Sequence, residues 1–131
     1  FYRGLLLAWS KRVEDNELAE MMDNLLNHNF WSPCFPIFQA SVRFDSATFD
    51  RLIDNIRSGK SDIFHYSMLW HHMFIKSFGG SKFFALLDEL REQEKGDLLV
   101  ADVLAMLTHA RHQPPEEYTK LIIEYSIKFL E

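Results

Sequence analysis

The chain has 131 residues, of which 47% are hydrophobic and 25% are charged, and its formal net charge is -5 at pH 7. This composition is typical of a globular domain and excludes a disordered segment. The acidic balance argues against a nucleic-acid partner, because binding to a phosphate backbone requires concentrated Lys and Arg. The longest uninterrupted apolar runs, such as residues 5–9, are far shorter than the roughly 20 residues of a membrane-spanning helix, so we expect no membrane partner.

The chain contains one cysteine, Cys34, which excludes an internal disulfide. A lone thiol suits a reducing compartment better than an oxidising one, so a cytoplasmic location is predicted. No Lys, Arg or His lies beside Cys34 in the sequence to favour its thiolate, and we do not expect it to be catalytic.

Apolar residues recur at spacings of three and four along most of the chain, which is the period of an amphipathic helix. The first helix is predicted over residues 2–13. A second helix is predicted from Asp15 or Asn16 to Asn27, with acidic residues in its first turn, where the helix dipole favours them.

Two prolines interrupt the helical pattern after this second helix. Pro33 and Pro36 each lack an amide donor and disfavour a helical conformation in the residue before them, which predicts an irregular loop over residues 27–36. Residues 37–44 fit neither the helix period nor the strand period cleanly, and both structures stay open for them.

The remaining residues predict five further helices, bounded by capping residues and glycine stops. These helices are expected from Asp45 or Ser46 to a stop at Gly59, over residues 62–78 after a cap at Ser61, from a cap at Ser81 to a stop at Gly96, over residues 98–111 and over residues 115–130. The last of them begins beside two prolines and two glutamates, which is a strong helix start.

The fold predicted from these elements is all-α. Short connections favour a compact single domain over residues 1–131, in which about six to seven short helices pack antiparallel to one another. Pairs of predicted helices follow one another at roughly 35 to 40 residues, so a repeat-like arrangement also stays open, although no residue pattern recurs.

No catalytic motif is complete. Gly59, Lys60 and Ser61 match the end of a phosphate-binding loop, but that motif requires a glycine five positions before Gly59, where Asp54 stands. A helix stop followed by a helix cap explains the same residues. The nucleophile elbow of serine hydrolases, Gly-x-Ser-x-Gly, is also absent from the sequence. We therefore expect no enzyme activity and no cofactor.

Histidines provide an alternative, a helical metal-binding or ligand-binding enzyme. The candidates are His65, His71, His72, His109 and His112. His109 and His112 are three residues apart, a spacing that metal ligands on one helix face use. The local sequence supplies no third ligand, and histidines at the end of a helix also stabilise its negative pole, so we expect no metal site.

The acidic charge is concentrated in one segment. Between Val13 and Val42 the chain has five carboxylates and no Lys or Arg, whereas the other residues include 14 acids and 14 bases. A concentration of unbalanced carboxylates attracts a positively charged partner.

The same segment contains an aromatic, proline-containing stretch. Its large apolar residues are Phe30, Trp31, Phe35, Ile37 and Phe38. These side chains either close one end of the bundle or form an exposed anchor patch, which prolines would stiffen. The predicted partner-binding residues are Glu14, Asp15, Glu17, Glu20, Asp23, Trp31, Phe35 and Phe38.

These features suggest a small acidic soluble protein that acts by binding a basic protein. The most concrete class is a bacterial immunity protein, or antitoxin, that occludes a basic toxin such as a nuclease. Such an inhibitor replaces the phosphate charge that the nuclease attracts, and it associates quickly. An adaptor or regulatory protein that uses the same surface is the other interaction hypothesis.

Overall fold

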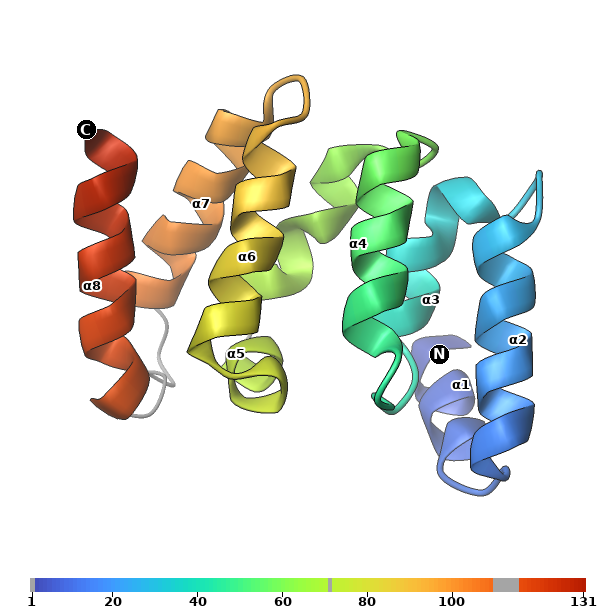
Figure 1. Ribbon diagram of the computed structural model, residues 1–131. Coiled ribbons are helices and arrows are strands. Elements are labelled where there is room, and N and C mark those ends of the chain that lie inside the picture. The colour runs from blue at the N-terminus through green and yellow to red at the C-terminus, as the bar shows by residue number, and fades with distance from the viewer. Residues whose placement is uncertain (1, 71, 110–115) are drawn as a thin grey trace. The chain divides into compact units, whose positions relative to one another are not determined.

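The computed structural model of the chain describes residues 2–70, 72–109 and 116–131 (Figure 1). Every regular element in these ranges is a helix, and they contain no strand. The prediction of an all-α fold is confirmed.

Contacts between residues divide the chain into two compact units. The N-terminal unit comprises residues 1–66, and the C-terminal unit comprises residues 67–131. The single domain predicted over residues 1–131, and the antiparallel or repeat-like order of its helices, stay predictions.

The N-terminal unit surrounds a core to which several short helices contribute. Its elements are α1 (Tyr2–Ser10), α2 (Asp15–Asn27), η1 (Ser32–Cys34), α3 (Phe35–Ala40), α4 (Thr48–Ser58) and the start of η2 (Ile63–Trp70), where η denotes a 3-10 helix. α2 contacts η1, α3 and α4, and α3 also contacts η1 and α4. The buried apolar side chains of this unit are Leu18, Met22, Phe35, Val42, Leu52, Ile53, Ile56 and Tyr66.

α4 shows how the local sequence sets the ends of a helix. The Asp45 carboxylate accepts a hydrogen bond from the backbone N–H of Ala47, and the Thr48 hydroxyl accepts one from the N–H of Asp45. This turn delays the start of the helix beyond the predicted Asp45 or Ser46. Gly59 has a φ of 67° and ends the helix in the left-handed conformation, as predicted.

The predicted loop over residues 27–36 is wrong in its second half, because η1 and then α3 begin there. Pro33 and Pro36 lie in the first turns of these two helices, where the amide donor that proline lacks would have no intrahelical partner. α3 ends at Ala40, so helix rather than strand follows in residues 37–40.

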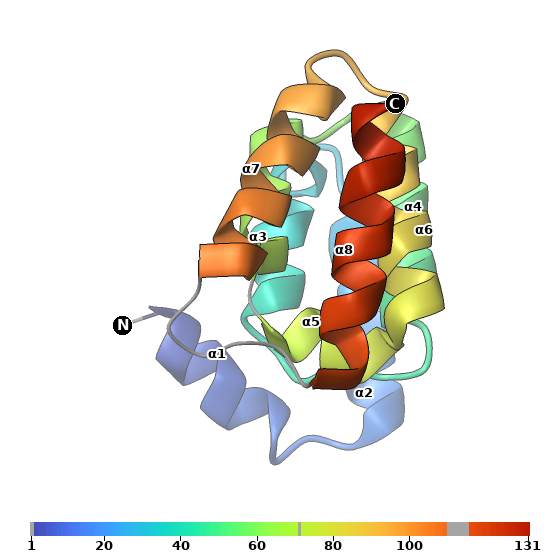
Figure 2. The same cartoon turned by 90° about the vertical axis from the view of Figure 1, so that its left-hand side faces the viewer.

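The C-terminal unit packs its helices around α6. Its helices are α5 (His72–Phe78), α6 (Gly80–Arg91), α7 (Gly96–His109) and α8 (Glu116–Leu130). α6 contacts α5, α7 and α8, and Figure 2 shows α8 running alongside α6. The core of this unit is almost entirely aliphatic and aromatic, and includes Phe74, Ile75, Phe83, Leu86, Leu87, Leu90, Leu99, Val100, Val103, Leu107 and Ile122.

The glycine between α6 and α7 has a different role from the predicted one. Gly96 is buried as the first residue of α7, and the left-handed conformation occurs one residue earlier, at Lys95, with a φ of 62°. A Cβ atom at Gly96 would overlap the backbone carbonyl of Leu90. Close approach of two backbone segments, rather than a helix stop, therefore requires glycine here.

The single helix predicted over residues 62–78 is also wrong, because the structure has the 3-10 helix η2 and then α5. The backbone N–H of His65 donates to the carbonyl of Asp62, which is the spacing of a 3-10 helix. Tertiary hydrogen bonds from Tyr66 to α4 and from His65 to Pro33 hold this tighter conformation.

Candidate partner-binding surface

The two sides of α2 differ in polarity. Leu18 and Met22 are buried in the core, whereas Glu17 and Glu20 are exposed. The exposed side is hollowed by about 320 Å³, in a depression lined by Glu17, Glu20, Met21, Asn24, Leu25 and His28. Neither Glu17 nor Glu20 forms an ion pair with any side chain that the structure describes.

Two of the five predicted acidic residues are paired within the chain. Asp15 Oδ1 lies 2.6 Å from Arg43 Nη2, and Asp23 Oδ1 lies 2.9 Å from Arg51 Nε. The expectation that no cation balances the acidic segment is therefore wrong for Asp15 and Asp23. The sequence did not reveal this pairing because both arginines follow the segment and reach it only through the fold.

Arg51 is the charged centre of a second groove. Its side chain is 4% exposed and also donates from Nη1 to both carboxylate oxygens of Asp45, at 2.9 and 3.0 Å. Burial lowers the pKa of Arg51, but the hydrogen bonds to Asp23 and Asp45 outweigh burial, so its pKa is raised and it stays charged.

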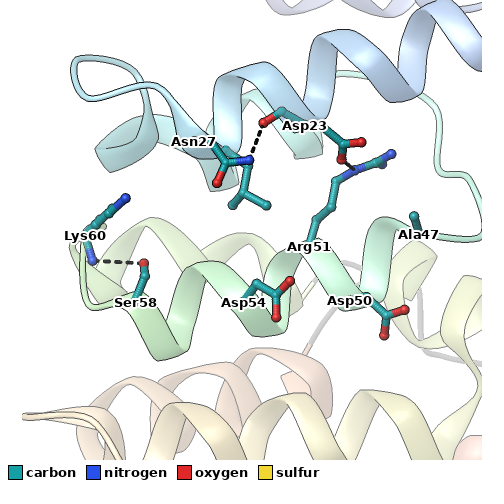
Figure 3. A pocket seen from close by; sticks show the side chains of 9 residues that line it. Asp23, Asn27, Ala47, Asp50, Arg51, Asp54, Ser58 and Lys60 are labelled. Carbon is teal, nitrogen blue, oxygen red and sulfur yellow. Dashed lines mark hydrogen bonds and ion pairs between the residues drawn. The ribbon is translucent and has the colours of Figure 1, made fainter.

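The groove beside Arg51 has a volume of about 370 Å³ and lies between α2 and α4. Figure 3 shows Arg51 reaching from α4 to Asp23 on α2, with Asp50 and Asp54 one turn apart along α4. Lys60 lines the same groove, so positive and negative side chains alternate there. This mixed charge makes the groove a poorer candidate for a basic partner than the exposed side of α2.

Three aromatic rings follow α2 and contact one another. Phe30 is 71% exposed and Trp31 is 42% exposed, and their ring centroids lie 4.6 Å apart, edge to face. Trp31 contacts Phe38 in the same manner at 5.8 Å. Edge-to-face pairs hold aromatic side chains in place and so reduce the entropy that binding would cost.

Phe35 does not belong to this exposed group. Its side chain is 0% exposed and packs in the core of the N-terminal unit, so the prediction that it anchors a partner is wrong. The physical reason is that α3 begins at Phe35 and contacts both α2 and α4, which turns this side chain inward.

His28 connects the carboxylates with the aromatic rings. It lines the hollow beside Glu17 and Glu20, and its ring atom Nδ1 accepts hydrogen bonds from the backbone N–H groups of Phe30 and Trp31, at 3.1 and 3.3 Å. We call the combined feature the acidic–aromatic surface, comprising Glu17, Glu20, Met21, Leu25, His28, Phe30, Trp31 and Phe38. Glu14 is exposed at the N-cap of α2 and does not line the hollow. Sequence reasoning missed Met21, Leu25 and His28 as members, and it named Phe30 in the aromatic stretch but not among the predicted partner-binding residues.

The histidines of the alternative hypothesis occupy separate environments. His65 Nδ1 lies 3.1 Å from the carbonyl oxygen of Pro33 in the N-terminal unit, and His109 is exposed at the end of α7. His71, His112 and the side chain of His72 lie outside the described residues. In the part of the chain that the structure describes, no group of three or more His, Cys, Asp or Glu side chains is placed to hold a metal ion.

Comparison of the chain with protein-family models, with curated proteins and with solved structures found no match. Among the described residues, no helix has both the length and the apolar character needed to cross a membrane. The chemistry of the acidic–aromatic surface is therefore the guide to function.

Proposed function

We propose that this chain binds a basic protein through the acidic–aromatic surface. The observation that supports the proposal most directly is the pair of exposed glutamates, Glu17 and Glu20, that have no ion pair with a described residue and share a hollow with His28. The ring of His28 in turn accepts hydrogen bonds from the backbone of the exposed Phe30 and Trp31. An isolated domain gains nothing from leaving both features exposed, whereas a partner would use the charge and the apolar area together.

The hollow on α2 suits a lysine or arginine side chain. Met21 and Leu25 line it with apolar atoms, against which the aliphatic stem of such a residue would pack. Glu17 and Glu20 line the same hollow and would pair with the charged group at the end of that stem. Phe30 and Trp31 would supply the buried aromatic contact that usually contributes most to binding free energy.

The concrete class that we propose is an immunity protein, or antitoxin, that occludes a basic toxin such as a nuclease in the cytoplasm. A nuclease presents a positive site for phosphate, and exposed carboxylates would compete for that site and accelerate association. In this proposal the chain acts without catalysis, cofactor or metal. An adaptor role would use the same surface on a partner that is not a toxin.

The test uses two charge-reversal variants with the same change in net charge. In the first, Glu17 and Glu20 are replaced by lysine; in the control, Glu92 and Glu94, which are exposed after α6, are replaced by lysine. Proteins of the source cell that bind the immobilised wild-type chain are identified, and their association rates are measured with each variant. We expect the first variant to slow association by about tenfold or more at low salt and the control to change it little.

A basic partner that loses binding only with the first variant supports the proposal. Trp31→Ala should weaken the same complex by about 2 kcal/mol, mainly through faster dissociation. If that partner is a nuclease and stoichiometric chain suppresses its activity, the immunity role is supported; undiminished activity in the complex favours the adaptor. Equal binding by the wild type and by the variant lacking Glu17 and Glu20 would contradict the proposal.

A further inference from the structure

His28 organises the turn that follows α2. Its backbone carbonyl accepts a hydrogen bond from the N–H of Ser32 at 2.9 Å, and its ring Nδ1 accepts from the N–H groups of Phe30 and Trp31. The backbone N–H groups of three successive residues therefore converge on one histidine. Asn or Asp usually provides this kind of side-chain acceptor in a turn, and the imidazole ring of His28 takes that role here.

The acceptor role requires an unprotonated Nδ1. Neutral imidazole has one nitrogen that donates and one that accepts, so His28 must carry its proton on Nε2. An imidazolium ring has an N–H at both positions and accepts no hydrogen bond. Protonation of His28 would thus place an N–H group against the two backbone N–H groups of Phe30 and Trp31.

We propose that His28 is a positioning residue for the acidic–aromatic surface, and that uptake of a proton by its ring releases Phe30 and Trp31. The proposal rests on the proposed function for its biological meaning, because it makes binding of a basic partner depend on pH. Protonation would also add a positive charge beside Glu17 and Glu20, which lowers the attraction for that partner. Both consequences weaken binding as the pH falls.

The charged residues that line the hollow with His28 both belong to α2. Glu17 and Glu20 line its hollow, and the backbone N–H groups of Phe30 and Trp31 face its Nδ1 atom. Neither η1 nor α3 contains a charged residue, and Cys34 is the only ionisable group in them. The charges that α4 and its C-terminal turn direct towards α2 lie in the separate groove lined by Asp23, Asp50, Arg51, Asp54 and Lys60.

The test follows the backbone amide resonances of Phe30 and Trp31 by NMR in the isolated chain. The pH is lowered from about 8 to about 5, the range over which histidine side chains change charge. In the wild type we expect both amide proton resonances to move upfield, with the same midpoint as the His28 ring resonances, because a lost hydrogen bond shields the amide proton. The nitrogen shifts of the ring at high pH should show an unprotonated Nδ1.

Two variants distinguish a positioning role of the His28 ring from a purely structural role of this residue. His28→Asn places an amide oxygen close to where Nδ1 lies, so it should retain the downfield amide shifts at all pH values and remove their pH dependence. His28→Ala should show the upfield shifts already at neutral pH. The ring resonances of His65 and His109, which both variants retain, are recorded as internal controls.

Amide shifts that stay constant while the His28 ring titrates would overturn the proposal, as would a pH response that persists in His28→Asn. Neither result depends on a partner, so the proposed function can fail while the switch is confirmed. Once a basic partner is identified, its affinity should fall with pH for the wild type and much less for His28→Asn. An equal fall for both proteins would show that His28 does not control binding.

Discussion

The two units of this chain achieve their stability by different means. Of the side chains that the structure describes, every buried polar or charged one lies in the N-terminal unit: Ser10, Ser32, Gln39, Ser41, Thr48, Arg51 and Asn55. The described core of the C-terminal unit is apolar, and α6 and α7 each contribute three buried leucine side chains to it. The N-terminal unit therefore combines an apolar core with buried hydrogen bonds, whereas the described core of the C-terminal unit depends on apolar packing.

Polar side chains of the N-terminal unit form hydrogen bonds with the irregular segment that carries Phe30 and Trp31. The Tyr66 hydroxyl donates to Asn55 Oδ1 at 2.6 Å, and Asn55 Nδ2 donates to the carbonyl of Ser32 at 3.3 Å. The Ser61 hydroxyl reaches the same carbonyl at 2.8 Å. Apolar contacts alone do not fix the path of a non-helical segment, whereas hydrogen bonds to its backbone do. The polar core therefore positions the turn on which Phe30 and Trp31 depend.

The largest effect is expected from the C-terminal core. Leu107 is 1% exposed in α7, and Leu107→Ala should lower the free energy of unfolding by about 2 to 5 kcal/mol through lost burial and the cavity that remains. Leu98 in the same helix is 62% exposed, so Leu98→Ala should change stability by less than about 0.5 kcal/mol. Urea unfolding followed by circular dichroism measures both. Equal effects would show that α7 is not packed as described.

The second-largest effect is expected when a buried ion pair of the N-terminal unit is removed. Arg51→Met keeps the apolar stem but leaves the carboxylate of Asp45, which is 18% exposed, without its cation. We expect a loss of about 3 kcal/mol in urea unfolding, because a mostly buried charge loses its partner. Lys60→Met removes an exposed cation from the same groove and should cost less than about 0.5 kcal/mol. A neutral or stabilising Arg51→Met would mean that packing holds both units.

Sequence reasoning predicted the helices of the C-terminal unit better than the connections in either unit. The apolar period located α6 and α7, each of which buries several apolar side chains, and the proline and glutamate pairs located the start of α8. It failed over η1, α3 and η2, where proline placement and hydrogen bonds between distant segments determine the conformation. Gly96 was recognised as special, but the close approach to Leu90 that requires it depends on tertiary structure.

The candidate site was predicted only in part, again because interactions between distant segments determine the rest of it. Glu17 and Glu20, two of the predicted partner-binding residues, are both exposed on α2. No local pattern shows that Arg43 and Arg51 reach back to Asp15 and Asp23, since these pairs span 28 residues each. A signal for His28 was present, as it follows a helix and precedes two aromatic residues, where a turn acceptor is common.

A pH-dependent prediction compares one tyrosine from each unit. Burial raises the pKa of Tyr66, and Tyr66→Phe removes its hydrogen bond to Asn55, so we expect a loss of about 2 kcal/mol near neutral pH. In the unfolded chain tyrosine ionises near pH 10, whereas the folded Tyr66 side chain still keeps its proton at that pH. The unfolded state then binds fewer protons, so wild-type stability should fall above about pH 10, by up to about 1.4 kcal/mol per pH unit.

Tyr66→Phe should make this alkaline decline shallower. Burial, followed by the hydrogen bond to Asp88, also raises the pKa of Tyr125 in the C-terminal unit, but this side chain is only half-buried. Tyr125→Phe should therefore change the decline less. Urea unfolding at several pH values from about 8 to about 11 measures the slopes. A steeper decline in Tyr66→Phe than in the wild type would contradict the assignment of a buried, protonated Tyr66.

The smallest effect is expected at the one polar core residue that gains no bond from its burial. Gln39 in α3 is 1% exposed, and neither Nε2 nor Oε1 has a hydrogen-bond partner among the described residues. Gln39→Met retains the length of the side chain and removes both polar atoms, so it should raise the free energy of unfolding by about 1 kcal/mol. Gln93→Met, at a half-buried position after α6, should bring no comparable gain. A higher free energy of unfolding in Gln39→Met would show that Gln39 only destabilises the N-terminal unit, unlike polar groups such as Arg51 and Asn55 that specify its structure. A lower free energy of unfolding would show that Gln39 belongs to the same polar framework.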